Sequence, residues 1–428
     1  MGIEYGERRS TFIDYGRPSL FLDFARRKSL IDSMSETNLI TFTRSSTGTY
    51  VGSDGLIKTA AADEPRFDHD PETGESLGLL IEESRTNYQD YSVDINTGRD
   101  ILTGSTLTAN AATALDGTTT ATRITGSGVD ENTRLGWNTQ GTSNTQYNVF
   151  SVFVKADSGT PILGFYSNTF VAGAVVFNIN LSDGSTNTIN GFGDFFSKVV
   201  AYPNGWYRVT VMGGPGTGPG GSWNINLVPS LTSARGASSG SNASASYLIW
   251  GVQEELVTAP FPTSYIPTSG STVTRQPDIT KITGTNFTDF YNSDEGTIYS
   301  EFTYGIRPWH FANDDANPNQ RFFGFSDPSG GIRVGRRIGG SYTYLSAPTT
   351  GSYGRGDNIK SVAAYDNTNF VVGAFGQVAT SGTTNGNTGI DRLLFYQSPS
   401  NPDTNGTIKK LLYYPTRLTN TQLQALTQ

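Results

Sequence analysis

Adjacent acidic residues are the first feature of the sequence that could do chemistry, because most glycoside hydrolases work with two carboxyl groups. Such doublets occur at Glu82-Glu83, Glu254-Glu255, Asp294-Glu295 and Asp314-Asp315. A glycosidase, however, needs its carboxyl groups about 5–10 Å apart across a cleft, and sequence neighbours on a strand point to opposite faces. We therefore expect these doublets to be solvated or turn carboxylates instead of catalytic pairs.

Histidine and cysteine are too scarce for the other common catalytic centres. The chain has two histidines, His69 and His310, and no cysteine, and neither histidine lies near a G-x-S-x-G motif. Thiol nucleophiles, disulfides and cysteine-based zinc sites are excluded, and a catalytic triad has no support. The cluster from 314 to 319 lacks the spacing of an EF-hand loop, so a plain acidic loop is favoured over a metal site. We expect a protein that is not an enzyme and that has no cofactor.

The region after residue 308 offers the chemistry of sugar binding, in which aromatic faces and hydrogen bonds from Asp, Asn and Arg hold the glycan. One polar stretch runs from 309 to 319 and another from 355 to 358. The alternative is that Trp309 caps the edge of a sandwich and that the polar residues are solvated. The candidate glycan-binding residues are Trp309, His310, Asp314, Asp315, Asn317, Asn319, Asp357 and Asn358.

Composition indicates an all-β protein with real cores. The 428 residues include 50 glycines, and 12% of the residues are aromatic while only 16% are charged. Low charge argues against disorder, and the aromatic residues supply apolar area. Period-two strands such as 147–155, 206–211 and 246–252 alternate with turns rich in Gly, Asn and Ser, which is typical of a sandwich or jelly roll. Within these strands we expect Trp206 and Trp250 in the core; the positions of Trp137 and Trp223 stay open.

Charge divides the chain into three regions, with 29 charged residues in 1–100, 14 in 101–270 and 25 in 271–428. Prolines between 260 and 277 stiffen a connector before the third region. Region 1–87 has only short apolar pieces, including a hairpin signal at Asp54-Gly55, so we expect it to pack on a sister subunit or a partner. At the other end, Thr419 or Asn420 can cap a short helix whose Leu423 and Leu426 share a face.

Four stretches together, 40–46, 50–58, 64–70 and 78–87, resemble an N-terminal segment of tailed-phage virion proteins, particularly those of cyanophages. The resemblance implies a virion structural protein that docks through its N-terminal region 1–87. A basic cluster beside a short apolar strand there could grip an acidic partner surface, although a solvated cluster beside a local strand is an equal alternative. The candidate docking residues are Leu20, Phe21, Phe24, Arg26, Arg27 and Lys28.

The rest of the chain also resembles known families. The stretches 205–209, 250–255 and 264–268 resemble carbohydrate-binding-module-like jelly rolls, which places such a domain at 88–270. Region 271–428, above all its closing part from 408 to 420, resembles a concanavalin-A-like or laminin-G-like sandwich. A structural calcium ion is compatible with this resemblance. The expected fold is therefore all-β, with an N-terminal β-rich docking region followed by jelly-roll and lectin-like sandwiches.

These resemblances imply a tail-fibre-type component that presents sandwiches to host-surface glycans. A capsid decoration or head-fibre protein and a glycan-degrading tailspike are the alternatives. Repeated copies favour closed symmetry, and trimers are common in fibres, so we expect a homo-oligomer and favour a trimer. The protein is expected on the virion, as an exposed appendage or on its surface, after synthesis in the host cytoplasm without a signal peptide.

Charge and hydropathy exclude two kinds of partner. The net charge is −8 and no basic stripe is present, so nucleic acid is not an expected partner. The N-terminus has no apolar core of signal-peptide length, and no stretch approaches the ~18 apolar residues of a membrane span. We expect no membrane insertion.

Overall fold

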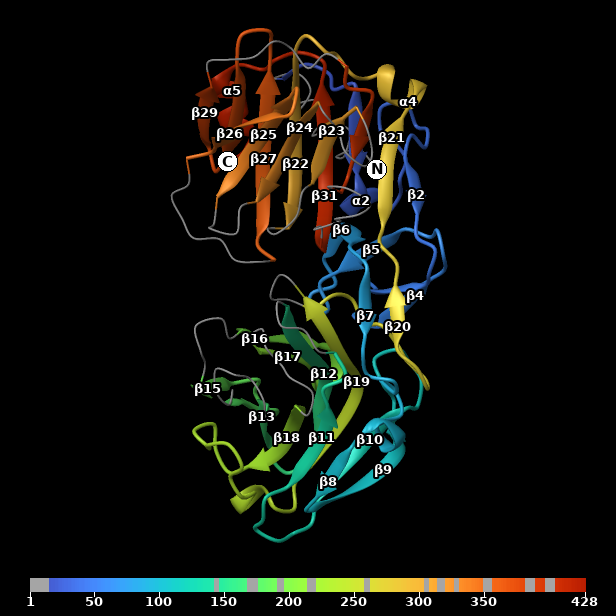
Figure 1. Ribbon diagram of the computed structural model, residues 1–428, viewed down its shortest axis with the longest axis vertical. Coiled ribbons are helices and arrows are strands. Elements are labelled where there is room, and N and C mark those ends of the chain that lie inside the picture. The colour runs from blue at the N-terminus through green and yellow to red at the C-terminus, as the bar shows by residue number, and fades with distance from the viewer. Residues whose placement is uncertain are drawn as a thin grey trace, which may run out of the picture.

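Short strands joined by turns dominate the chain, and they build an all-β structure of two lobes stacked end to end (Figure 1). We call these lobes the upper and the lower sandwich, as they stand in Figure 1. The computed structural model describes residues 15–141, 146–167, 176–190, 196–213, 221–257, 262–303, 308–313, 320–326, 331–348, 356–381, 389–396 and 405–428.

The lower sandwich consists of two six-stranded antiparallel sheets whose inner faces share one core. In spatial order the first sheet contains β16 (Phe196–Tyr202), β17 (Trp206–Gly213), β12 (Tyr147–Ser158), β19 (Ser246–Val257), β10 (Ala121–Gly126) and β9 (Ser105–Ala112). The second contains β15 (Thr186–Asn190), β14 (Val176–Asn180), β13 (Ile162–Ser167), β18 (Ser222–Val228), β11 (Arg134–Asn138) and β8 (Ile101–Thr103). All of these strands lie within the region 88–270.

Tryptophans fill the interior of the lower sandwich. The ring of Phe150 lies 5.4 Å from that of Trp223 and 5.6 Å from that of Trp137, and all three are buried. Trp206 and Trp250 are buried as well, which confirms the expectation from their strand patterns. The sequence has few runs of aliphatic residues, so large aromatic side chains supply much of the apolar area of this core.

The upper sandwich packs an eight-stranded sheet on a seven-stranded one. The first sheet runs β29 (Gln377–Ser381), β28 (Phe370–Ala374), β27 (Asn358–Tyr365), β22 (Gly296–Thr303), β31 (Asn405–Tyr414), β6 (Ser76–Glu82) and β5 (Arg66–His69), with β1 (Leu20–Asp23) also paired to β31. The second runs β2 (Thr41–Thr43), β21 (Ile279–Thr283), β30 (Arg392–Leu394), β23 (Trp309–Ala312), β24 (Arg321–Ser326), β25 (Ile332–Ile338) and β26 (Ser341–Ser346).

Strands β1, β2, β5 and β6 of the N-terminal region belong to the sheets of the upper sandwich, which corrects the expectation that the apolar pieces of 1–87 pack on a sister subunit or a partner. One half of β31 pairs with β1, placing Leu20 opposite Tyr413, and the other half pairs with β6, placing Ile408 opposite Leu79. These four side chains are fully buried in one core. The apolar pieces of this region are short because they complete sheets whose other strands come from the C-terminal end of the chain.

A narrow waist joins the two lobes (Figure 1). It contains the pair β7 (Arg85–Asn87) and β20 (Val273–Arg275) and the hairpin β3 (Gly48–Val51) and β4 (Ile57–Ala60). The hairpin forms at Asp54-Gly55 as predicted, and Gly55 takes a φ of 73°, which favours glycine.

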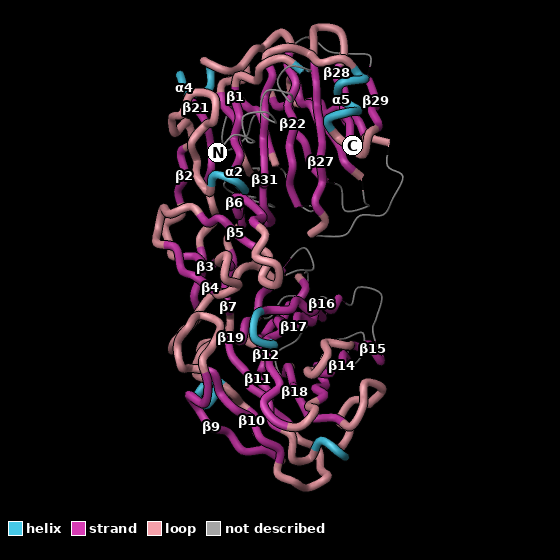
Figure 2. The backbone as a smooth tube through the Cα atoms, turned by 180° about the vertical axis from the view of Figure 1, so that it is seen from behind, coloured by secondary structure: helices cyan, strands magenta, loops and turns pink. Residues whose placement is uncertain are grey.

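Helices are short in the described part of the chain. They are α2 (Phe24–Arg27), α3 (Ile95–Gly98), α4 (Thr285–Thr288) and α5 (Asn420–Leu426), with 3-10 turns η1 (Pro203–Gly205) and η2 (Gly240–Asn242). Helix α5 packs on β27, β28 and β29 behind the eight-stranded sheet (Figure 2). Thr419 caps it in a capping box with Gln422, and Leu423 is buried, as the sequence predicted.

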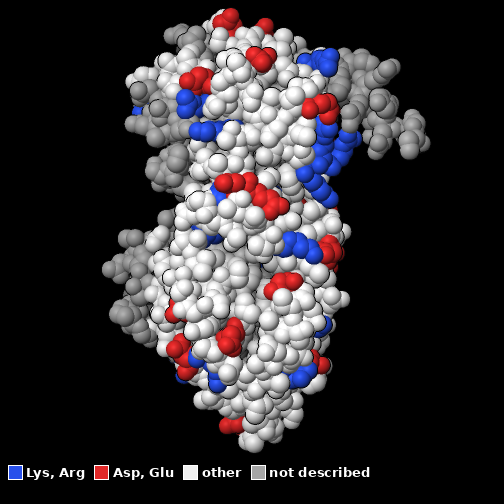
Figure 3. All heavy atoms as spheres, turned by 90° about the vertical axis from the view of Figure 1, so that its right-hand side faces the viewer, with Lys and Arg blue, Asp and Glu red and all other residues white. Residues whose placement is uncertain are grey.

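Charged side chains are sparse on the face that Figure 3 shows, and both signs are mixed there. This distribution fits a chain in which only 16% of the residues are charged. No helix among the described residues is long and apolar enough to span a membrane.

Candidate functional site

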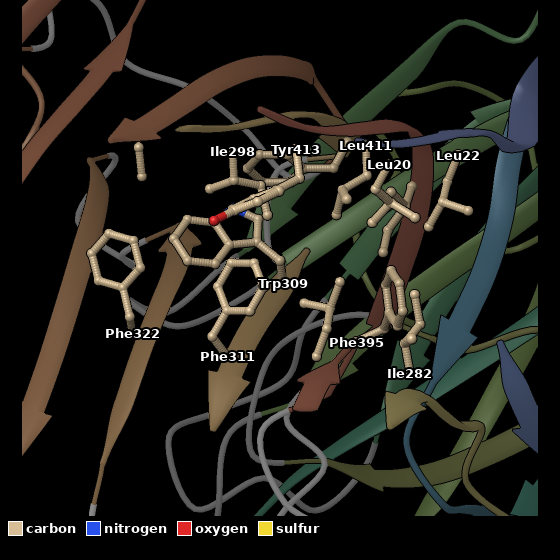
Figure 4. Packing of buried hydrophobic residues seen from close by; sticks show 14 of the residues in the cluster. Leu20, Leu22, Ile282, Ile298, Trp309, Phe311, Phe322, Phe395, Leu411 and Tyr413 are labelled. Carbon is tan, nitrogen blue, oxygen red and sulfur yellow. The ribbon is translucent and has the colours of Figure 1, made fainter. Parts of the chain in front are cut away.

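Trp309 lies inside the upper sandwich, and this corrects its assignment as a sugar-binding side chain. Its side chain is 1% exposed, and the ring lies 5.3 Å from Phe322 and 5.8 Å from Phe311 (Figure 4). A Cβ atom added to Gly324 would lie 2.7 Å from the indole, so the indole covers that glycine on the neighbouring strand. A sugar ring has no access to an indole in this position.

His310 is also buried, although it points to the opposite face of β23. Its ring lies 5.4 Å from Phe323, and Nδ1 donates a hydrogen bond of 3.3 Å to the Tyr396 carbonyl. His310 is therefore a packed side chain with a backbone partner, and its assignment to a glycan surface is corrected too.

The other candidate glycan-binding residues fall into two groups. Asp357 and Asn358 are exposed, and Asn358 donates a hydrogen bond of 2.8 Å to Glu301 on β22. A Cβ atom on the adjacent Gly356 would lie 3.7 Å from Lys198 of the lower sandwich, so this loop faces the other lobe. The structure does not join this loop with Trp309 into one surface. Asp314, Asp315, Asn317 and Asn319 lie outside the described residues.

An exposed pair of tyrosines on β26 is a better candidate for a contact surface. Tyr342 and Tyr344 are 44% and 51% exposed, and they are two of the five large apolar side chains that are exposed in the described part of the chain. Their rings are parallel within 4° and their centroids are 5.6 Å apart. Because they are two residues apart on a strand, both point to the same face of the sheet. Strand β26 is the last strand of the seven-stranded sheet, so no further strand of that sheet lies beside the pair.

The local sequence explains why this pair is held in place. Gly339 and Gly340 both have positive φ, 55° and 91°, and such a two-glycine turn matches the twist of a tight hairpin between β25 and β26. A Cβ atom on Gly335 would lie 2.4 Å from the ring of Phe323, so that ring lies over the glycine. The ring of Tyr344 lies 6.4 Å from Phe323, edge to face. A packed phenylalanine therefore supports the exposed tyrosine.

Two arginines lie over the ring of Tyr342. The guanidinium carbon of Arg337 is 5.1 Å from the ring centroid and that of Arg321 is 5.6 Å away. Both distances are within the range of a cation–π contact. Burial lowers the pKa of Arg321, and the charge of Arg337 lowers it further. We call Arg321, Phe323, Arg337, Tyr342 and Tyr344 the tyrosine–arginine platform.

Neither Tyr342 nor Tyr344 is among the candidate residues predicted from the sequence, so the platform was missed. A signal was present, because the Tyr-x-Tyr spacing follows a Gly-Gly turn and a strand containing three arginines. That β26 lies at the edge of its sheet depends on long-range pairing, which this local pattern does not contain.

Most of the candidate docking residues are structural. Leu20 and Phe24 are fully buried in the core of the upper sandwich, and Phe21 packs in the cluster under α5. Arg27 donates two hydrogen bonds to Glu36. Only Arg26 and Lys28 expose their side chains, so the docking assignment is corrected for the three apolar residues.

The doublets Glu82-Glu83 and Glu254-Glu255 are buried, so the expectation that they are solvated or turn carboxylates was wrong. Glu82 accepts hydrogen bonds from Arg66 and Ser264. Burial alone would raise its pKa, but the charges of Arg275 and Arg66 hold it at about 2. Glu83 is also buried and pairs with Arg85.

On β19 the two carboxylates point to opposite faces of the strand. Glu254 accepts hydrogen bonds from Gln89 and Asn148, while Glu255 accepts them from Thr263. All of these side chains are buried, and burial raises the pKa of Glu254. No group of three or more His, Asp or Glu residues in the described ranges is placed to hold a metal ion.

Comparisons with known proteins find only distant likeness. No family model and no curated protein matches this chain. Among solved structures, a CBM40 module of a Ruminococcus gnavus sialidase, bound to α2,3-sialyllactose, is 20% identical over 32% of this chain and 83% of its own, with a TM-score of 0.27. Domain 4 of the Geobacillus stearothermophilus arabinanase AbnA, with arabinotriose, is 14% identical over 39% and 82%, with a TM-score of 0.30.

A third similar structure is a heptameric pentraxin of Limulus polyphemus, 12% identical over 32% of this chain and 70% of its own, with a TM-score of 0.25. Scores this low do not place the chain in any of these families. The assignment to antiparallel β-sandwiches rests on the strand pairing described above.

Proposed function

We propose that this chain is a non-enzymatic glycan-binding protein that contacts sugars through the tyrosine–arginine platform. The observation that carries the proposal is the exposed, parallel pair of Tyr342 and Tyr344 beside the guanidinium of Arg337. Aromatic rings present flat apolar faces to the C–H faces of sugars, and guanidinium groups donate hydrogen bonds to hydroxyl and carboxylate oxygens. The platform is preorganised because β-sheet pairing and Phe323 fix it before any ligand arrives.

A glycan array followed by calorimetry tests this proposal. Tyr342→Ala and Tyr344→Ala should each weaken binding at least about tenfold while leaving folding intact, because exposed substitutions usually change stability by less than about 0.5 kcal/mol. Val129→Ala is a matched control, since Val129 is 60% exposed on the lower sandwich. Trp309→Phe is a second control and should leave affinity unchanged. Binding that survives both tyrosine substitutions would overturn the assignment of the site.

The proposal includes no reaction. The carboxylates of Glu82, Glu83, Glu254 and Glu255 accept hydrogen bonds from, or form ion pairs with, side chains of their own chain, and this supports a role without catalysis. Incubation of the purified protein with each glycan that it binds provides the test. Release of reducing ends would show that the protein is an enzyme and would favour the alternative of a glycan-degrading tailspike.

We place the protein on a tailed-phage virion, as a tail-fibre-type component. The support is the resemblance of the stretches 40–46, 50–58, 64–70 and 78–87 to virion proteins, and many copies on one particle would raise weak affinity through effective concentration. Antibody labelling of intact particles, viewed by electron microscopy, distinguishes a tail location from a capsid decoration or head fibre. Absence of label from the particles would overturn this placement.

Docking to the particle is proposed through the exposed cations of the 26–28 cluster. Arg26→Glu combined with Lys28→Glu reverses two exposed charges and leaves the buried Leu20 and Phe24 intact. This variant should fold but fail to join particles, whereas Lys58→Glu, an exposed control on β4, should join normally. Normal incorporation of the double variant would exclude the cluster.

A further inference from the structure

A row of asparagines crosses the outer face of one sheet of the lower sandwich. The strand register places Asn178 of β14 opposite Asn187 of β15 on one side and opposite Gly164 of β13 on the other. Gly164 in turn lies opposite Asn226 of β18. The strand neighbours of Asn178, Gly164 and Asn226 all belong to the core, so these three residues face away from it. We call Asn187, Asn178, Gly164 and Asn226 the asparagine row.

The loop that follows β18 covers this row. Residues 229–239, which we call the strap, cross the sheet along the row, because the order of their contacts follows the order of its strands. The outer face of an antiparallel sheet is commonly solvated, whereas here Asn178 is fully buried and Asn226 is 1% exposed. Side-chain amides of the row donate hydrogen bonds of 2.9–3.3 Å to strap carbonyls: Asn187 to Leu231, Asn178 to Leu231 and Ser233, and Asn226 to Ala237.

The strap leaves an acceptor of the row unpaired. A side-chain amide has N–H donors and a carbonyl acceptor, whereas a backbone carbonyl can only accept. The Oδ1 atom of Asn178 is buried and has no hydrogen-bond partner within the described ranges. A Cβ atom on Gly164 would lie 2.9 Å from this oxygen and 2.8 Å from Oδ1 of Asn226, so the two acceptors converge over the glycine. A buried acceptor without a donor weakens the closed arrangement.

An aromatic ring lies beside the row and also contacts the strap. Tyr166 follows Gly164 by two residues on β13, so both face the same side of the sheet. Tyr166 is 5% exposed, and the guanidinium carbon of Arg235 in the strap lies 5.6 Å from the centroid of its ring. The strap therefore covers both polar and aromatic groups, the two kinds of contact that hold sugars.

Hydrogen bonds hold the strap, and core packing does not. None of the residues 229–239 belongs to a core cluster of the described chain. Besides the row, Asn132 donates a hydrogen bond of 2.7 Å to the Gly236 carbonyl, and Asn132 itself is exposed. Segments with few buried apolar contacts are the ones that open at the lowest free-energy cost. The strap can therefore open while the core of the sandwich stays intact.

We propose that the asparagine row and Tyr166 form a second sugar-binding site, for a neutral glycan chain that displaces the strap. Sugar hydroxyl groups both donate and accept, so they can pair with the Oδ1 atoms of the row as well as with its N–H groups. The ring of Tyr166 offers an apolar face to the C–H side of a sugar. All four residues of the row are uncharged, which favours a neutral glycan. The site is separate from the tyrosine–arginine platform; in the wild-type chain the strap keeps it closed, so binding there reports the platform.

The affinity for neutral hexasaccharides of glucose, xylose, mannose and galactose, measured by calorimetry, tests this proposal. The full chain carries Tyr342→Ala and Tyr344→Ala, so that the platform does not contribute. Replacing 231–237 by Gly-Ser-Gly removes the closed state, and at least one hexasaccharide should then bind at least about tenfold tighter. In this shortened chain Tyr166→Ala and Asn226→Ala should each weaken binding at least about tenfold, because only their contacts with the sugar are lost there.

Asn132→Ala tests the closure without shortening the chain. The substitution removes the bond to the Gly236 carbonyl and leaves the row intact, and exposed substitutions of this kind seldom affect folding. Loss of one such bond from the closed state should tighten hexasaccharide binding about two- to tenfold. Asn96→Ala is the matched control, because Asn96 is exposed on α3 and accepts a side-chain hydrogen bond from Arg99. In hydrogen exchange of Asn132→Ala, a saturating hexasaccharide should speed the exchange of the amides in 231–237.

The outcomes separate this site from the platform. Absence of hexasaccharide binding in both the shortened chain and Asn132→Ala would overturn the second site and leave the platform in place. Failure of the platform would not affect this test, because both tyrosines are already replaced. If the shortened chain does not fold, Asn132→Ala decides: an affinity equal to that of its parent would exclude competition between strap and glycan. A synthetic peptide with the strap sequence that bound the shortened chain when no hexasaccharide did would also overturn the proposal.

Discussion

Arg66 and Asp278 form a buried ion pair, with 2.5 Å between Nη2 and Oδ2, although 212 positions separate them in the sequence. Arg44 donates to the other carboxylate oxygen of Asp278 at 2.9 Å. Arg66 also donates to Glu82, beside which Arg275 lies at 3.4 Å. The cluster thus contains three arginines and two carboxylates. The chain passes from the upper to the lower sandwich after Glu82 and returns before Asp278. The cluster therefore connects the two segments of chain that join the sandwiches.

Asp278→Asn should destabilise the protein strongly. The substitution removes one of two negative charges and leaves three buried arginines, and breaking a buried pair in this way typically costs about 3–5 kcal/mol. Urea denaturation measures the change. Asp54→Asn is the control, because Asp54 forms an exposed pair with Lys58, and such pairs contribute about 0–1 kcal/mol. Equal effects of the two substitutions would contradict the role of the cluster.

The free energy of unfolding should depend on pH through Asp68. Its carboxylate accepts a hydrogen bond of 2.7 Å from the Val51 amide, and burial raises its pKa to about 7, against about 3.9 in an unfolded chain. Because the folded pKa is the higher one, the protonated carboxyl favours folding. This contribution is complete below about pH 4 and is lost as the pH rises through about 7.

Denaturation of the wild type and of Asp68→Asn across this pH range tests the assignment. The stability of the wild type should fall relative to that of the variant between about pH 4 and 7 and should run parallel to it above about 8. The depressed pKa of Glu82, about 2, lowers the stability of both proteins as the pH falls below about 5, so its contribution cancels in the difference between them. A constant difference from pH 4 to 7 would contradict the raised pKa.

Local features of the fold were predictable from the sequence, because they depend on neighbouring residues. The Asp54-Gly55 turn, the capping box at Thr419 and the burial of Trp206 and Trp250 follow from patterns a few residues long. The pairing of β31 with β1 and β6 joins segments more than 300 residues apart. Short apolar strands are compatible with many partners, so the alternation pattern did not show that region 1–87 completes the upper sandwich.

The candidate site was less predictable than the fold. Trp309 lies on β23, whose four residues are all buried, while Tyr342 lies on β26, most of whose residues are exposed. Which face of a strand is covered depends on the second sheet and on strand order, and neither can be read from one strand. The position of Trp309 in a polar stretch of sequence therefore did not show whether its side chain is exposed.

Gly335→Ala should damage both the stability and the binding of the upper sandwich. An added Cβ atom would meet the ring of Phe323 at 2.4 Å and force it away from Tyr344. Overpacking of this kind costs about 1–3 kcal/mol. Thr343→Ala is the control, because Thr343 is exposed on the opposite side of β26. Calorimetry and glycan binding on the same samples give both readouts, and unchanged binding in Gly335→Ala would show that Phe323 does not support the platform.

Separate fragments should differ in their ability to fold. The fragment 88–270 contains both sheets of the lower sandwich and their core, so it should unfold cooperatively on heating. The fragment 271–428 lacks β1, β2, β5 and β6, which carry the buried Leu20, Leu22 and Leu79 of the upper core. Loss of one buried leucine side chain costs about 2–5 kcal/mol, so the loss of all three is comparable with the whole stability of a typical domain, about 5–15 kcal/mol.

We therefore expect the fragment 271–428 to aggregate or remain unfolded alone, as judged by circular dichroism and the dispersion of its amide NMR signals. Addition of a 15–87 peptide during refolding should recover soluble complex, because that peptide supplies the missing strands. Cooperative unfolding of 271–428 by itself would show that the N-terminal strands are dispensable. That result would restore the interpretation, made from the sequence, that region 1–87 is a separate docking region.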